Sequence, residues 1–206
     1  METLEFVPLD GKKLTVEFIQ KSERLSKEDI EHIKRLIEEK KPDFAAEELG
    51  DRTIDDFYKK DPYAGVFQDA GVLIYPVDIS EYAKTSISAV VDEKRRLVDA
   101  VEASYMDEED AEYVKAYAEA LRAEYEEMRE QEEISIRNDW MVKGILDCAH
   151  RVSKEDILCI FIGDAIHWDG MMELLRSVGA EIHTTPFPTS QQIHNAYIDV
   201  ESTGPI

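Results

Sequence analysis

Short apolar runs that are typical of β-strands alternate with segments of helical periodicity along most of the chain. The strand-like runs are residues 3–7, 14–19, 43–49, 72–75, 157–162 and 180–184. Helices are predicted between them, and residues 80–150 form a long region with helical periodicity only. Because a strand–helix–strand crossover makes the two strands parallel, this order predicts an α/β domain. We expect a mostly parallel central sheet flanked by helices, with a helical insertion before the last two strands.

Local signals predict where several of these elements begin and end. Asp10 and Gly11 separate the first two apolar runs, which is a strong β-hairpin signal and predicts an N-terminal antiparallel edge. Ser26 precedes a helical run and is followed by Asp29, as in a capping box. Gly179 is placed as the residue that ends the last helix. We therefore expect a single domain over residues 1–206, with a turn-rich tail over 185–206.

Residues 107–133 are rich in Asp and Glu and are predicted to form an amphipathic helix. A run of acidic side chains of this kind is usually the solvated face of such a helix. The apolar stripe on the other face is long for a small domain to bury alone, and we expect it to lie near a homodimer interface. The stripe consists of Tyr113, Tyr117, Leu121, Tyr125 and Met128.

The formal net charge of −22 excludes several classes of function. A general nucleic-acid binder needs a basic face, and anionic lipid repels so acidic a surface. The first residues contain no apolar signal region, and the longest apolar run is far too short to span a bilayer. Cys148 and Cys159 both lie in apolar surroundings, which predicts buried, reduced thiols. We therefore expect a cytoplasmic protein with no membrane or nucleic-acid partner.

Polar and ionisable residues follow most of the predicted strands. Ligands of open α/β sheets collect at the carboxyl ends of the strands, so these residues could converge on one crevice. They are Lys21 and Arg24, Glu47 and Glu48, Asp78, and Asp164 and His167. Strand alternation predicts that Glu48 points inward and that Glu47 points to the opposite face and is solvated.

Four segments resemble the TraB, pheromone-shutdown and Tiki-like family, in the same order and across most of residues 14–184. KPDFAAEELGD (41–51) resembles the family's strand, and IRNDWMVKGI (136–145) resembles its Arg-Asn helix. FIGDAIHWDGMMELLRSVGAEI (161–182) resembles its last strand, Gly-x-x-His turn and helix, and residues 26–43 resemble its first helix. The resemblance implies an α/β fold and a hydrolase, with a divalent metal such as Zn or Mn in catalytic members.

Carried over residue by residue, the resemblance assigns a site to named positions. Glu48 matches the strand glutamate, Arg137 and Asn138 match the Arg-Asn pair, and Gly163 and His167 match the second motif. This chain departs from the second motif by an added residue, because three residues separate Gly163 from His167. It departs from the first motif as well, because Lys21 and Arg24 stand where the family has Gly and His.

These assignments leave two functions open. In the first, Glu48 and His167 hold a metal or do acid–base work, Arg137 stabilises developing negative charge, and the substrate is a small molecule or peptide. Asp78, Gly163 and Asp164 support that site. In the second, Lys21 and Arg24 make an anion-binding pocket or a salt-bridge cluster without catalysis. Because a guanidinium has no lone pair for a metal, Arg24 predicts that metal binding is weak or absent.

Overall fold

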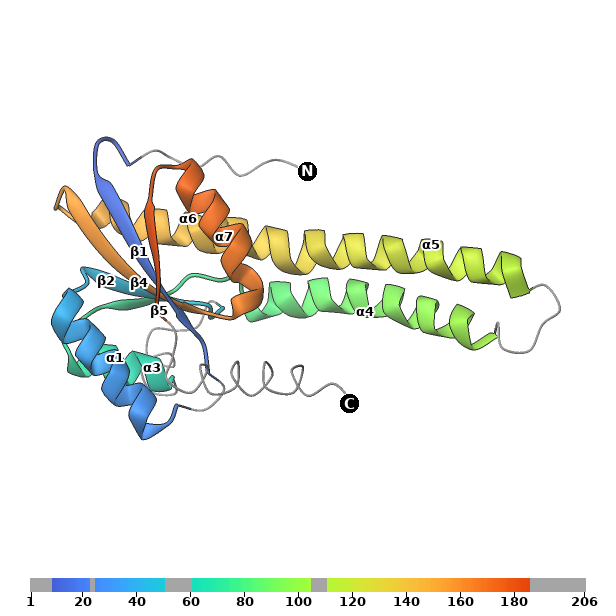
Figure 1. The fold of residues 1–206 in the computed structure, drawn as a ribbon, viewed down its shortest axis with the longest axis horizontal. Helices are drawn as coiled ribbons and strands as arrows, with labels where there is room; N and C mark the ends of the chain where they lie inside the picture. Colours follow the sequence, from blue (N-terminus) through green and yellow to red (C-terminus); the bar gives the residue numbers. More distant parts are fainter. Residues whose placement is uncertain (1–8, 23–24, 51–60, 105–110, 186–206) are drawn as a thin grey trace, which may run out of the picture.

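The computed structural model describes residues 9–22, 25–50, 61–104 and 111–185, and Figure 1 shows their arrangement. Five parallel strands form one sheet in the order β3-β2-β4-β1-β5. They are β1 (Lys13–Gln20), β2 (Phe44–Glu47), β3 (Ile74–Pro76), β4 (Asp156–Gly163) and β5 (Glu181–Thr185). The predicted α/β class, with helices on both faces of a parallel sheet, is confirmed.

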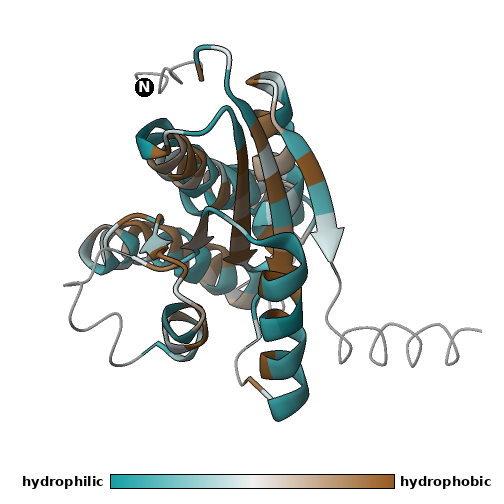
Figure 2. Ribbon diagram, turned by 90° about the vertical axis from the view of Figure 1, so that its left-hand side faces the viewer, coloured by the Kyte–Doolittle hydropathy of each residue, from teal (hydrophilic) through white to brown (hydrophobic). Residues whose placement is uncertain are grey.

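The sheet is buried on both faces, as its almost uniformly apolar central strands require. On one face, Val16 and Phe18 of β1 pack with side chains of α6 (Ile136–Arg151) and α7 (Trp168–Ser177). On the other face, Ile19 packs with side chains of α1 (Lys27–Lys40) and α3 (Pro62–Asp69). Figure 2 shows the hydrophobic residues concentrated on the sheet and on the inner faces of the helices.

The predicted ends of two helices are confirmed. The Ser26 hydroxyl accepts from the Asp29 N–H, and the Asp29 carboxylate accepts from the Ser26 N–H, so the capping box at the start of α1 is complete. Gly179 follows α7 with φ of 87°, a conformation that favours glycine. The helix predicted to begin at Thr53 lies outside the described residues, and so does the tail from 186 onward.

The predicted N-terminal hairpin is wrong in its pairing, although its turn forms. The Lys12 N–H donates to the Leu9 carbonyl, and both Asp10 and Gly11 have positive φ, as in a tight turn. β1, however, pairs in parallel with β4 over its whole length and with β5 from Thr15 to Ile19. Both edges of β1 are thus paired in parallel from Thr15 to Ile19, and residues 3–7 lie outside the described residues.

The helical insertion forms an arm that projects from the sheet (Figure 1). α4 (Glu81–Ser104) and α5 (Ala111–Arg129) run antiparallel and in contact, and α5 continues through a π-helical turn, η2 (Glu130–Ser135), into α6. Leu121 of the predicted stripe is buried, as is Val98 of α4, whereas Tyr117 is half exposed. Part of the stripe therefore packs within the chain, and part of it is exposed. The homodimer stays a prediction.

Two further sequence predictions concern the two cysteines and the possibility of a membrane span. Cys148 and Cys159 are both buried and free, and burial raises the pKa of the Cys148 thiol to about 11, so these thiols stay protonated. Among the described residues, no helix combines the length and the apolar character needed to cross a bilayer.

Candidate functional site

The candidate site lies at the carboxyl edge of the sheet, where three neighbouring strands end. Glu48 directly follows β2, Asp78 follows β3, and His167 ends the short 3₁₀ turn Ala165–His167 after β4. Because β2 lies between β3 and β4 in the sheet, Glu48 is placed between the other two. The order of the strands thus brings together residues that are far apart in the sequence.

Glu48 is the centre of the site. Its Oε1 lies 2.5 Å from Arg137 Nη2 and 3.5 Å from His167 Nε2, and its Oε2 accepts from the Asp164 N–H at 2.6 Å. The structure therefore brings together the three side chains that the sequence assigned to one site. Asp164 contributes through its backbone, because the loop after β4 turns its N–H toward the Glu48 carboxylate.

Arg137 joins Glu48 to a second buried carboxylate. Its Nη2 and Nε donate to Asp78 at 2.7 and 3.2 Å, and Lys84 Nζ lies 2.7 Å from Asp78 Oδ2. Burial alone would raise the pKa of Asp78, but hydrogen bonds from Arg137 and Lys84 outweigh burial, and the pKa lies below its usual range. Asp78 is therefore a fixed anion that orients the guanidinium.

His167 is buried and held in one orientation. Its Nδ1 lies 2.7 Å from Asn138 Oδ1, an acceptor, so the imidazole donates from Nδ1 and carries its lone pair on Nε2. Burial lowers the pKa of His167 below 6.5, although the neighbouring Glu48 carboxylate acts in the opposite direction. At neutral pH, His167 Nε2 and Glu48 Oε1 are therefore two acceptors that face each other with no hydrogen between them.

Two glycines allow these side chains to come close. A Cβ on Gly163 would lie 2.5 Å from the Phe161 ring and 3.3 Å from Glu48 Oε2. A Cβ on Gly170, in α7, would overlap the Nδ2 atom of Asn138. The sequence did not single out Gly170, and only the packing of α7 on α6 indicates its role.

Replacing Gly170 with alanine is expected to lower the free energy of unfolding by about 1–3 kcal/mol, because the new methyl group displaces Asn138. The displacement also releases His167 Nδ1, so the imidazole ¹⁵N signals should show loss of the single tautomer. Gly65→Ala is the matched control, because a Cβ at Gly65, also in a helix, would contact nothing. Unchanged imidazole signals in the Gly170 variant would contradict the role of Asn138.

Glu47 lies differently from what the sequence predicted, and Lys21 pairs with it. Glu47 is fully buried rather than solvated, because the face of β2 to which alternation turns it is covered by α3. Lys21 Nζ lies 2.8 Å from Glu47 Oε1 and donates to the Glu48 carbonyl at 2.9 Å. Lys21 is thus held in a salt bridge with Glu47 of β2, which is one of the two roles that the sequence left open for it. Arg24 lies outside the described residues.

The Glu47 carboxyl should make the stability of the protein depend on pH. Burial raises its pKa to about 7, although Lys21 acts against burial, and neither carboxylate oxygen has an aligned hydrogen-bond donor among the described residues. The folded state thus keeps a proton that the unfolded state loses near pH 4.5, so stability falls as pH rises from about 5 to 7 and stays low above.

Replacing Glu47 with glutamine removes this titration. We expect the variant to gain about 2 kcal/mol relative to the unaltered protein between pH 5 and pH 8. Denaturant unfolding at several pH values measures the difference. Glu130→Gln is the control, since its carboxylate is exposed. Stability curves that run parallel for the Glu47 variant and the unaltered protein would show that Glu47 is ionised throughout.

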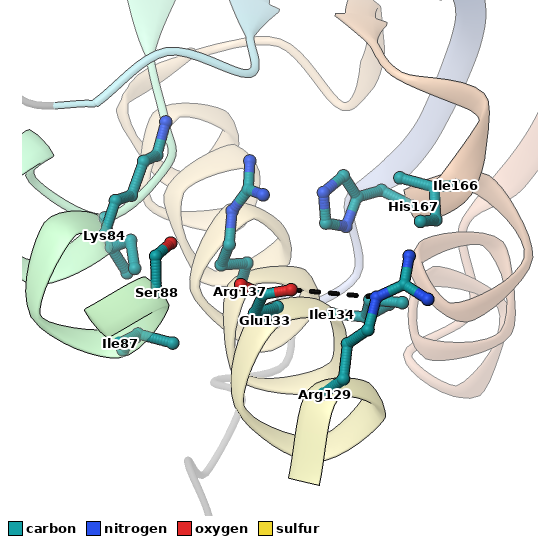
Figure 3. A pocket seen from close by; sticks show the side chains of 10 residues that line it. Lys84, Ile87, Ser88, Arg129, Glu133, Ile134, Arg137, Ile166 and His167 are labelled. Carbon is teal, nitrogen blue, oxygen red and sulfur yellow. Dashed lines mark ion pairs between the residues drawn. The ribbon is translucent and has the colours of Figure 1, made fainter. Parts of the chain in front are cut away.

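A cavity of about 190 Å³ opens beside His167 (Figure 3). Lys84 of α4, Arg129 of α5 and Arg137 of α6 line it with His167, so the arm supplies part of the site. Sequence reasoning missed Lys84 and Arg129, because no local signal shows that α4 and η2 pack against the sheet edge. π-helical turns such as η2 occur frequently at functional sites.

The described residues do not fit the metal that the family resemblance implies. Glu48 Oε1 and His167 Nε2 are two candidate ligand atoms, but Arg137 already binds that carboxylate oxygen. Among the described residues, no group of three or more His, Cys, Asp and Glu side chains could hold a metal ion. A catalytic zinc site ordinarily has three protein ligands. We therefore derive no step that depends on a metal.

Comparison with known proteins finds no family model, no curated protein and no solved structure that matches this chain. The resemblance to the TraB and Tiki-like family stays a prediction from the quoted segments. The site is therefore interpreted from its own geometry.

Proposed function

We propose that Glu48 and His167 form the acid–base centre of a hydrolase. The observation that carries the proposal is the pair of facing acceptors, His167 Nε2 and Glu48 Oε1, 3.5 Å apart beside a cavity. One water molecule can donate a hydrogen bond to each of them. Asn138 fixes the imidazole by accepting from Nδ1, as an orienting residue does for a general base.

The chemistry follows from these contacts. His167 Nε2 takes a proton from the bound water as the water oxygen bonds to the carbonyl carbon of the substrate. The negative charge of Glu48 stabilises the imidazolium that forms, and Arg137 places a positive charge beside the developing oxyanion. When the carbon–leaving-group bond breaks, His167 returns the proton to the leaving atom, so the proton balance is restored.

The test is a screen for hydrolysis with a panel of peptides, N-acyl amino acids, amides and esters. His167→Asn keeps a donor near the Nδ1 position for Asn138 but removes Nε2, and we expect activity to fall roughly 100- to 10,000-fold. His183→Asn, at an exposed imidazole on β5, is the matched control and should be fully active. Hydrolysis that survives unchanged in His167→Asn would overturn the proposal.

The activity should also depend on pH in a defined direction. A general base must be neutral, and the pKa of His167 lies below 6.5 because the ring is buried. We therefore expect kcat/KM to be constant above pH 6.5 and to fall only as the pH drops through this lowered pKa. A loss of activity centred above pH 6.5 would assign the base to another group.

A second candidate function is a non-catalytic module that binds a small anion. It is favoured by the neutralisation of Glu48, both of whose oxygens are already occupied by Arg137 and the Asp164 N–H. The absence of any hydrolysis across the panel, together with binding of a small anion, would favour this function. The predicted homodimer and cytoplasmic location are compatible with both functions.

A further inference from the structure

We propose that the cavity beside His167 binds a small organic carboxylate that has a branched apolar body, with Arg129 as the partner of its carboxylate. Its volume of about 190 Å³ corresponds to roughly six water molecules, so the ligand is small. Binding of this carboxylate does not depend on catalysis. The further statement that the ligand is a substrate or product rests on the proposed hydrolase centre.

The walls of the cavity are apolar and branched. Four isoleucines line it, from four different segments: Ile79, Ile87, Ile134 and Ile166. Ile166, beside His167, keeps about half of its surface exposed. A ligand with a branched hydrocarbon body would cover this surface and gain the free energy of apolar burial.

The polar groups favour a singly charged ligand over a doubly charged one. Lys84, Arg129 and Arg137 face the cavity, and Glu133 is the one acidic side chain among its lining residues (Figure 3). Behind the lining, however, Asp78 and Glu48 neutralise Lys84 and Arg137. Because the cations are largely balanced in this way, a monoanionic carboxylate fits better than a phosphate dianion.

Arg129 is the cation of the cavity whose N–H groups are available to donate hydrogen bonds to a ligand. Lys84 Nζ and Arg137 Nη2 lie within 2.7 Å of Asp78 and Glu48, so both cations are already paired. Arg129 is 41% exposed, and its ion contacts with Glu126 and Glu133 are 3.6 and 3.8 Å long, which is beyond hydrogen-bond distance. Its planar guanidinium can therefore turn to a carboxylate and bind it with two parallel hydrogen bonds.

The test is a calorimetric titration of the full chain with 4-methylpentanoate, its neutral amide 4-methylpentanamide, and acetate. We expect the acid to bind roughly tenfold or more tightly than the amide, because the amide lacks the charge that Arg129 pairs with. Acetate should bind more weakly than 4-methylpentanoate as well, because it lacks the apolar body. N-acetyl-leucine carries the same branched apolar group and a carboxylate, and its blocked amino group mimics the carboxyl end of a peptide. Comparing its affinity with that of 4-methylpentanoate distinguishes a free acid from a peptide end as the ligand.

Two variants identify the site. Arg129→Met should weaken binding of 4-methylpentanoate roughly tenfold or more and leave the amide unaffected. Arg122→Met, at an exposed arginine on the same helix, is the matched control and should change neither affinity. Both sites are exposed, so thermal unfolding should be unchanged. Equal binding of acid and amide, or full affinity in Arg129→Met, would overturn the proposal.

The His167→Asn variant separates this inference from the proposed function. It should still bind 4-methylpentanoate, because the carboxylate partner is Arg129 and the isoleucine walls are intact. If binding holds while no hydrolysis is found in any variant, the carboxylate site stands and the hydrolase proposal fails. If hydrolysis depends on His167 but Arg129→Met binds normally, the hydrolase proposal stands and the carboxylate site fails.

Discussion

Replacing Arg137 with methionine is expected to lower the free energy of unfolding by about 3–5 kcal/mol. Arg137 bridges Asp78, whose side chain is fully buried, and Glu48, whose side chain is 11% exposed. Without the guanidinium, the two carboxylates lose their shared partner, and Asp78 keeps the Lys84 ammonium while Glu48 keeps the Asp164 N–H. Uncompensated buried charge is among the most destabilising outcomes of a single substitution.

Denaturant unfolding at pH 7 measures this effect, and two controls define it. Arg129→Met removes an arginine from the same cavity but from long, solvent-exposed ion contacts, so its effect should be close to zero. Arg137→Lys keeps the charge but loses the fork that contacts both carboxylates, and should lie between the two. A loss below about 1 kcal/mol in Arg137→Met would show that the bridge contributes little to stability.

Replacing Asp78 with asparagine is expected to cost about 2–4 kcal/mol at neutral pH, because Arg137 and Lys84 both lose a buried anionic partner. The pKa of Asp78 in the folded protein lies below 3.8, so the folded state holds its proton less tightly than the unfolded chain. The stability from this group is therefore fully present above about pH 4 and is lost as the pH falls through the lowered pKa.

Comparison of acid unfolding in the two proteins tests this account. The unaltered protein should lose stability steeply below about pH 4, and Asp78→Asn should be less stable at pH 7 but show a flatter acid dependence. Asp92→Asn, at an exposed carboxylate on α4, is the control and should follow the unaltered protein. Two curves of equal slope below pH 4 would show that Asp78 titrates alike in the folded and unfolded states.

Features that depend on local sequence were predictable. The Ser26 capping box, the turn at Asp10–Gly11 and the glycine after α7 each follow from the preferences of a few neighbouring residues. The convergence of Glu48, Arg137 and His167 was also predictable, from the rule that strand ends form the site and from the family segments. The placing of Glu48 and His167 needed only the order of the strands, whereas that of Arg137, on α6, came from the family segments.

Features that depend on tertiary packing were not predictable from the sequence. Alternation predicted a solvated Glu47, but the sheet is covered on both faces, so that side chain is turned toward α3 instead. The hairpin failed for a related reason, because two parallel strands occupy both edges of β1. Arg129 lies in the segment 107–133, whose charged face was predicted to be solvated, and only the packing of the arm brings it to the site.

A ¹⁵N NMR titration of the His167 imidazole determines whether His167 is a fixed, neutral base. We expect a single tautomer with the proton on Nδ1, a lone pair on Nε2, and a pKa below 6.5 because the ring is buried. The tautomer should be lost in Asn138→Leu, and exposed His183 provides the reference signal in the same spectra. A mixture of tautomers that titrates as His183 does, and that is indifferent to Asn138, would contradict a fixed base facing Glu48.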